Sequence, residues 1–185
     1  MAPYNDGMVH FLLCHRQICP PEEENCFSAN TLVTVLGRGS AIPMKDLKVG
    51  DQVLTSQGNG QPDEYQPVYA FGHIDPYVPA TFVCIYTEDA PAELTKQHMV
   101  YIYGKTRPVH SDSIQVGDIL RGRDGSASAV TKISTIKRSG VYNPLTPSGT
   151  IVVNGIVAST YIDLASQGGS IEACLLYTSP SPRDR

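Results

Sequence analysis

Short apolar runs separated by glycine-containing turns make up the chain from residue 31 onward. These runs are rich in Val, Ile and Tyr, residue types that are enriched in strands. None of them holds a helical repeat for more than two turns, so we predict an all-β chain. The dipeptide Asn154-Gly155 lies between the last two runs and predicts a two-residue hairpin. The strands that we expect from this pattern are 32–36, 67–71, 82–86, 131–136, 151–153 and 156–158.

One segment recurs in the chain, around a shared Val-Gly-Asp. Residues 46–54 (Asp-Leu-Lys-Val-Gly-Asp-Gln-Val-Leu) resemble residues 112–120 (Asp-Ser-Ile-Gln-Val-Gly-Asp-Ile-Leu). The two Gly-Asp pairs are 117 − 50 = 67 residues apart, which is longer than most solenoid repeats. We interpret the echo as a duplicated half-domain with two similar β units about a pseudo-two-fold axis. The alternative is chance recurrence of a Val-Gly-Asp turn.

Length and charge narrow the classes of protein. At 185 residues with 41% apolar residues, the chain suits one domain with a real core. The net charge is −4, the pI is about 5.7 and the basic residues are scattered, so we expect no nucleic-acid or anionic-membrane surface. No apolar run approaches the roughly 20 residues that span a bilayer, and no signal peptide is recognisable.

The chain has five cysteines, an odd number. Cys84 lies in a strand-like run and is interpreted as a small buried hydrophobe. Cys14 and Cys19 precede Cys26, and their spacing leaves a disulfide and free thiols both open. His15 completes a Cys/His group that could be imagined as zinc ligands, but the group lacks the paired C-x-x-C spacing of common structural zinc sites. We therefore expect no metal and no cofactor.

Cys26 is the candidate nucleophile, aimed at the Asn25–Cys26 peptide bond just before it. It stands where an acidic lead-in ends and a strand-like run begins. His98 is the candidate acid and base, since its ordinary pKa of about 6.5 allows both roles. Thr95 precedes it by three residues, where it could share a turn with His98 and hydrogen-bond the amide. Alone, a cysteine and a distant histidine are weak evidence, because they must meet in the fold.

Together with a later run, these residues resemble one family. The Cys26 opening, the Thr95-x-x-His98 turn and residues 143–154 (Asn-Pro-Leu-Thr-Pro-Ser-Gly-Thr-Ile-Val-Val-Asn) resemble the Hint domain of hedgehog C-terminal autoprocessing regions and hedgehog-like proteins, related to inteins. Segments 49–54 and 158–161 match in the same order. The resemblance implies a Hint fold of two pseudo-symmetric β subdomains from a duplicated half, and a secretory or extracellular location.

The resemblance also implies a chemistry. In an N–S acyl shift, the Cys26 thiol attacks the Asn25 carbonyl through a five-membered ring and leaves a thioester with a free Cys26 amine. The family gives these roles of acid–base catalysis and amide contact to the residues that match His98 and Thr95. A free thiol has a pKa of about 8.5, so we expect the surroundings to activate it.

The second step is the transfer of the acyl group to a nucleophile. In hedgehog proteins an aspartate activates cholesterol, and a rough alignment on Phe71 places His73 at that position, with Asp75 as the fallback two residues on. No region for sterol recognition is visible before the tail, so we expect hydrolysis or transfer to thiols, not cholesterol attachment. The acceptor (water, a thiol, or a sterol or lipid) is left open.

Two further positions depart from relatives. Thr160 stands where the family often has a cysteine, so a thiol–disulfide role is lost there. Splicing of the intein type needs a C-terminal asparagine after a histidine, whereas Asn154 follows Val153 inside a predicted hairpin. We do not expect splicing.

The expected organisation has three parts. Residues 1–25 are an upstream remnant or linker, 26–165 the Hint autoprocessing domain, and 166–185 a disordered tail. Residues 174–185 look like translated sequencing-adaptor sequence and are excluded from fold reasoning.

The expected function is a monomeric, self-cleaving domain whose substrate is its own upstream segment. The first alternative is an inactive Hint-like β domain that serves as a binding or structural module. A second is a zinc-stabilised interaction module that uses the N-terminal Cys/His cluster.

Overall fold

The structure is a computed structural model that describes residues 25–58 and 61–161. The strands there are β1 (Phe27–Ser28), β2 (Leu32–Val33), β3 (Ile42–Pro43), β4 (Gln52–Thr55), β5 (Glu64–Pro67), β6 (Ala70–Tyr86), β7 (Ala92–Leu94), β8 (Met99–Tyr101), β9 (Pro108–His110), β10 (Ile119–Arg121), β11 (Ala127–Ala129), β12 (Lys132–Leu145), β13 (Thr150–Val153) and β14 (Ile156–Ser159). Single 3-10 turns occur at η1 (Met44–Asp46), η2 (Ser111–Ser113) and η3 (Arg123–Gly125). The all-β prediction is confirmed.

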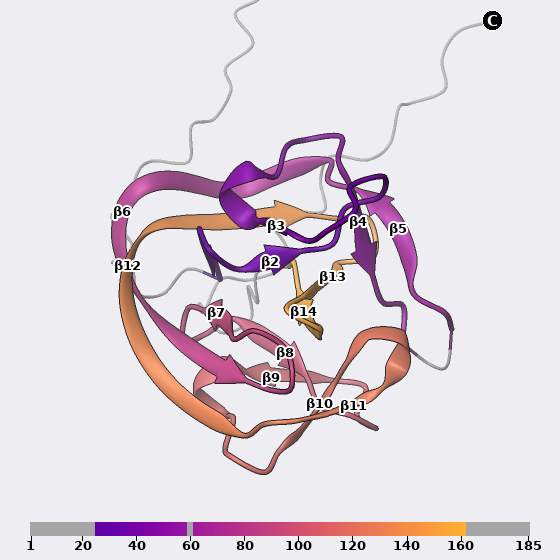
Figure 1. Ribbon diagram of the computed structural model, residues 1–185, viewed down its shortest axis with the longest axis vertical. Helices are drawn as coiled ribbons and strands as arrows, with labels where there is room; N and C mark the ends of the chain where they lie inside the picture. Colours follow the sequence, from indigo (N-terminus) through magenta and orange to yellow (C-terminus); the bar gives the residue numbers. More distant parts are fainter. Residues whose placement is uncertain (1–24, 59–60, 162–185) are drawn as a thin grey trace, which may run out of the picture.

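Two long strands, β6 and β12, run antiparallel along one side of the molecule (Figure 1). The short strands β1 and β7 close them into a barrel in the order β1-β12-β6-β7. Closure depends on Phe27, which pairs with Tyr142 on one side and with Leu94 on the other. The residue just before Phe27 is Cys26, so the barrel seam positions the candidate nucleophile.

A six-stranded sheet, in the order β3-β2-β13-β14-β8-β9, forms the other large layer. Its centre is the hairpin between β13 and β14, whose turn residues Asn154 and Gly155 have φ of 46° and 79°. Two consecutive positive φ angles are what a type I′ hairpin requires. The predicted hairpin is confirmed.

The duplicated half is visible in the turns that follow η1 and η2. Gly50 and Gly117 have φ of 93° and 94°, a region that L side chains rarely adopt. The Gly50 amide donates to the Val68 carbonyl at 2.8 Å, and the Gly117 amide donates to the Val130 carbonyl at 2.9 Å. The backbone geometry is thus the same at both copies of the echo, as a duplicated half-domain requires.

The same offset of 67 relates two strand contacts that each join the echo to a residue outside it. The isolated bridge from Val35 to Val53 corresponds to the bridge from Ile102 to Leu120, and 35 + 67 = 102 while 53 + 67 = 120. The duplication thus extends across whole strands. The predicted pair of pseudo-symmetric units is present in the fold.

Some strand bounds differ from those expected. The run 32–36 is a strand only to Val33, and the run 67–71 is interrupted because the amides of Val68 and Tyr69 donate to Asp51 and Leu145 in separate places. The runs 82–86 and 131–136 are parts of the much longer β6 and β12. Partner strands extend these two beyond their apolar segments, which local pattern alone does not reveal.

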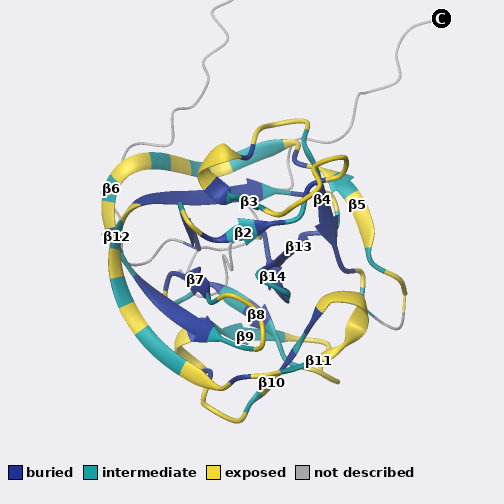
Figure 2. Ribbon diagram, viewed as in Figure 1, coloured by how far each residue is buried: buried dark blue, intermediate teal, exposed yellow. Residues whose placement is uncertain are grey.

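The main core cluster takes buried residues from both halves, among them Val53 and Leu120, and the buried segments of the ribbon are dark blue in Figure 2. Phe27, Val33, Leu94, Val100 and Ile151 are fully buried within this cluster. Burial of each such side chain stabilises the fold by about 1.5–3 kcal/mol. Cys84 is a buried free thiol, as predicted.

Among the described residues, no helix has the length and apolar character needed to cross a bilayer.

Candidate active site

Cys26 lies at the entry to β1 with only 1% of its surface exposed. Burial raises the pKa of its thiol to about 12, because an apolar environment disfavours the charged thiolate. The thiol is therefore protonated at neutral pH, and a base must take its proton when it attacks.

Thr95 holds the backbone of Cys26 by reciprocal hydrogen bonds. The Cys26 amide donates to Thr95 Oγ1 at 2.9 Å, and the Thr95 amide donates to the Cys26 carbonyl at 2.9 Å. The Thr95 hydroxyl also donates to that carbonyl at 3.3 Å. The nitrogen of the predicted scissile bond is thus in direct contact with the residue predicted to hydrogen-bond it.

His98 follows Thr95 in one tight turn, in which its amide donates to the Thr95 carbonyl at 3.0 Å. The ring is fully buried and packs on Phe27 with 4.1 Å between ring centroids. Its Nε2 lies 2.9 Å from the Ser159 carbonyl; since a carbonyl only accepts, this network assigns the ring proton to Nε2. Nδ1 is buried and has no hydrogen-bond partner among the described atoms.

The pKa of His98 falls from its ordinary value to about 4, because burial disfavours the charged ring. The Ser159 carbonyl and the Cys26 backbone oppose this shift. At neutral pH the ring is therefore neutral, and its unprotonated Nδ1 is available as an acceptor beside the Cys26 backbone.

His73, on β6, is the imidazole within hydrogen-bonding reach of the thiol. Its Nδ1 lies 3.6 Å from Cys26 Sγ. Burial lowers the pKa of His73, and the nearby Asp75 carboxylate acts in the opposite direction. The sequence assigned His73 to the second step alone, whereas this contact also places its ring within reach of the thiol proton.

Asp75 has a different set of contacts. Its Oδ1 accepts the amides of Tyr77 at 2.9 Å and Val78 at 3.2 Å, at an exposed turn within β6. Its carboxylate acts on the site electrostatically, by raising the pKa of His73. Of the two candidates for the acyl-transfer base, His73 is the one at the sulfur.

Asn143 was missed by sequence reasoning. It lies opposite His73 in the β6–β12 register, one residue from Tyr142, which pairs with Phe27. It is 1% exposed, and its Oδ1 has no hydrogen-bond partner among the described atoms. The only signal in the sequence is one amide side chain before Pro144 in an apolar run, and the pattern does not say which face it occupies.

Thr160 is buried and joins Thr146 near the end of the described chain. Their hydroxyl oxygens lie 3.4 Å apart, and the Thr146 amide donates to Thr160 Oγ1 at 3.5 Å. A threonine here makes hydrogen bonds where a thiol would offer redox chemistry.

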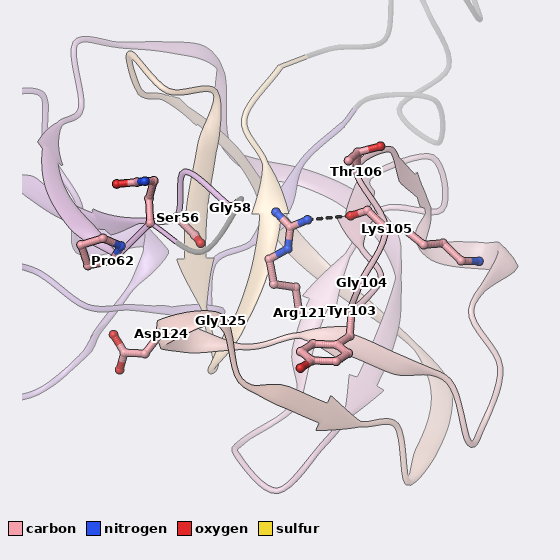
Figure 3. Close-up of a pocket in the computed structure, with 11 residues that line it drawn as sticks. Ser56, Gly58, Pro62, Tyr103, Gly104, Lys105, Thr106, Arg121, Asp124 and Gly125 are labelled. Carbon is pink, nitrogen blue, oxygen red and sulfur yellow. Dashed lines mark hydrogen bonds between the residues drawn. The ribbon is translucent and has the colours of Figure 1, made fainter.

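A separate hollow of about 660 Å³ lies around Arg121 (Figure 3). The guanidinium donates to the Lys105 carbonyl at 2.6 Å and stands 4.9 Å from the centre of the Tyr101 ring. Neither Cys26 nor His98 lines this hollow. It is not part of the site around the thiol.

The described residues contain no group of three or more His, Cys, Asp or Glu side chains arranged for a metal ion. Cys14, His15 and Cys19, the imagined zinc ligands, lie outside the described residues.

Comparison with known proteins places this chain in one family. A family model described as the Hint module matches residues 19–170. The chain therefore belongs to the Hint module family, and the resemblance seen in the sequence is confirmed.

Two relatives illustrate the similarity. The chain is 30% identical over 172 residues to Indian hedgehog B protein of Danio rerio, covering 84% of this chain and 42% of that protein. It is 31% identical over 145 residues to Warthog protein 1 of Caenorhabditis elegans, covering 74% of this chain and 29% of that protein. The chain spans less than half the length of these relatives.

Solved structures share the fold at lower identity. A DnaB intein from Synechocystis is 14% identical with a TM-score of 0.64, covering 75% of this chain and 100% of the intein. A bacterial intein-like domain from Clostridium thermocellum is 18% identical with a TM-score of 0.64, covering 74% of this chain and 99% of that domain.

Proposed function

We propose that this chain cleaves itself at the Asn25–Cys26 bond through a thioester and releases the segment upstream of it. Membership of the Hint family supports an autoprocessing domain in general terms. The observation that carries the specific proposal is the 2.9 Å hydrogen bond from the Cys26 amide to Thr95 Oγ1, with the His98 ring in the same turn.

In the first step, His73 Nδ1 takes the proton of the Cys26 thiol, and Sγ attacks the Asn25 carbonyl carbon. The new C–S bond forms, the C–N bond breaks, and the Cys26 nitrogen gains one proton, so the step neither consumes nor releases protons. We assign its delivery to a relay in which the proton taken up by His73 passes through His98 Nδ1, which is unprotonated at rest and has no hydrogen-bond partner among the described atoms, to the departing nitrogen, so that both rings end neutral. The Thr95 hydroxyl orients the departing nitrogen.

In the second step, a nucleophile attacks the thioester carbonyl, and the C–S bond breaks to regenerate the thiol. His73 again lies nearest the sulfur and takes the proton of the incoming group. We propose water or a small thiol as the acceptor, the upstream segment as the substrate, a monomer as the working form, and the secretory pathway or outside of the cell as the location.

Mass spectrometry of freshly expressed protein tests this proposal. Cleavage gives a fragment that begins at Cys26, and added dithiothreitol accelerates its appearance by intercepting the thioester. Cys26→Ala must abolish the fragment, whereas Cys84→Ala, at the other described cysteine, must retain it. If Cys26→Ala still yields the fragment, an outside protease makes the cut and the mechanism is wrong.

One observation favours an inactive Hint-like module as the second candidate. The Cys26 thiol is 1% exposed and its pKa is raised to about 12 by burial, so an incoming acceptor has little access to it. An inactive module gives one intact mass with and without dithiothreitol. The same experiment thus separates the two functions.

A further inference from the structure

The duplication places a second set of polar residues at the positions that mirror the site. Shifting Thr95 and His98 back by 67 gives Ser28 (95 − 67 = 28) and Thr31 (98 − 67 = 31), and shifting Cys26 forward gives Glu93 (26 + 67 = 93). None of the three mirror residues takes part in the proposed chemistry.

The mirror turn keeps the backbone geometry of the catalytic turn. The Thr31 amide donates to the Ser28 carbonyl at 3.2 Å, as the His98 amide donates to the Thr95 carbonyl at 3.0 Å. The Thr31 hydroxyl donates to the Glu93 carbonyl at 2.9 Å, so the turn still holds the residue that stands in the place of Cys26. The scaffold of the site is present twice.

Glu93 is buried, with 6% of its surface exposed. The Ser28 hydroxyl donates to its Oε2. Arg138, from β12, lies 3.0 Å from its Oε1 and 2.9 Å from its Oε2 through Nε. Burying a charge is costly unless it is paired and hydrogen-bonded, and here both conditions hold.

These contacts lie beside the scissile bond in the barrel seam. Ser28 is two residues after Cys26 on one strand, and Glu93 is two residues before Thr95 on the other, on either side of the Phe27–Leu94 pair. Residues two apart on a strand share a face. The Ser28–Glu93 hydrogen bond therefore joins β1 to β7 two residues away from the contact between Cys26 and Thr95.

We propose that Ser28, Glu93 and Arg138 form a clamp that positions the scissile amide for the first step. The clamp fixes the register of β1 against β7, so that the Cys26 nitrogen stays on the Thr95 hydroxyl. Its members touch neither the thiol nor the scissile bond, so they are positioning residues. The expected effect of the clamp on cleavage rate rests on the proposed self-cleavage. Its expected effect on the hydrogen bond between Cys26 and Thr95 does not.

Kinetics separate positioning from a general loss of stability. We expect Ser28→Ala and Glu93→Gln each to slow dithiothreitol-induced cleavage by roughly 10- to 100-fold, the range that a small misalignment of reacting groups costs. Hydrolysis of the thioester once formed should keep its rate, because it needs only Cys26 and His73. A double variant should be no slower than either single one, as for residues that act as a unit.

A matched charge control lies on the same strand as Arg138. Arg138→Ala should behave like Glu93→Gln, whereas Lys137→Ala removes the neighbouring, exposed positive charge and should leave both steps unchanged. If both steps slow together in proportion to a fall in melting temperature, the cluster is merely structural and the proposal is overturned.

A second readout needs no activity at all. In the full chain carrying Cys26→Ala, the amide proton of residue 26 reports its hydrogen bond to Thr95 by chemical shift and by hydrogen exchange. Adding Ser28→Ala should move this resonance upfield and speed its exchange, and adding Lys137→Ala should not. An unchanged resonance in the Ser28 variant overturns the clamp even if the unmodified chain cleaves. If the resonance shifts as expected but the unmodified chain does not cleave, only the proposed function is overturned.

Discussion

The amide of Cys26 and the amide of Thr95 each donate to the other residue, at 2.9 Å in both directions. One acceptor is a side-chain hydroxyl and the other is a backbone carbonyl. As a result, a substitution at Thr95 can remove the acceptor of the Cys26 amide and still leave the backbone hydrogen bond between the two residues in place.

Thr95→Ala should slow the first step less than His98→Ala does. The threonine supplies one hydrogen bond to the amide, whereas His98→Ala removes the proton path and should cost about 10²- to 10⁴-fold, the usual span for a positioned acid–base group. Fragment yield over time measures both, with retained β circular dichroism as the control for folding. An unchanged rate in folded His98→Ala would remove that residue from the site.

His73→Ala should slow release at both steps, because Nδ1 lies 3.6 Å from the sulfur that attacks first and leaves second. The first step is followed as dithiothreitol-induced cleavage and the second as spontaneous hydrolysis. His110→Ala, on β9, is the matched histidine control and should keep full rates. Full rates in His73→Ala would contradict its role as a base, and a cholesterol-sized mass gain on the released fragment would contradict the proposed acceptor.

The rate of cleavage should fall with acid as His73 becomes protonated and can no longer take the thiol proton. Burial lowers the pKa of His73, so the midpoint should lie below the ordinary histidine value of about 6.5. Asp75→Asn keeps an oxygen for the turn but removes the charge that raises this pKa, and should move the midpoint lower still. A midpoint that rises in Asp75→Asn would contradict the assignment.

Stability should also fall with acid through His98. Its pKa is about 4 in the folded chain and about 6.5 when unfolded, so between these values the unfolded state binds more protons and stability rises with pH. Full stability is present above about pH 6.5 and up to about 3 kcal/mol is lost on descending to pH 4. Urea unfolding of Cys26→Ala with and without His98→Gln measures this; equal pH dependence in both would refute it.

Gly50→Ala and Gly117→Ala should destabilise the fold by similar amounts. Both glycines have positive φ, 93° and 94°, and an added Cβ would meet nothing within 4 Å at either site. The cost is therefore backbone strain alone, about 1–2 kcal/mol each. Thermal unfolding of the two variants measures it. Unequal losses would show that the two halves are not energetically equivalent at this turn.

The sequence predicted what depends on local chemistry and failed where strands meet. Asn154-Gly155 and the two Gly-Asp turns require particular backbone angles, so their residues reveal them. The contact of His73 with Cys26 depends on where β6 bends and pairs, and no local pattern encodes it. Asn143 was missed for the same reason, since only the register with β6 shows that it is buried beside His73.

The clamp was not predicted from the sequence either, although the offset that relates Ser28 and Glu93 to the site was already known. The echo at residues 46–54 gave the offset of 67, but Ser28 and Glu93 share no residue type with Thr95 and Cys26. Duplicated halves keep backbone geometry after their side chains diverge. Only the hydrogen bonds of Thr31 reveal that the two turns are equivalent.

The hydrogen bond from His98 to the Ser159 carbonyl has a consequence for timing during synthesis. The site draws on residues from Cys26, near the start of the domain, to Ser159, at the end of β14. A ribosome that has made the thiol and the Thr95 turn has not yet made the strand that holds the His98 ring. Under the proposed self-cleavage, the nascent chain therefore stays in one piece until nearly the whole domain has emerged, and a chain truncated before β14 should keep its upstream segment attached.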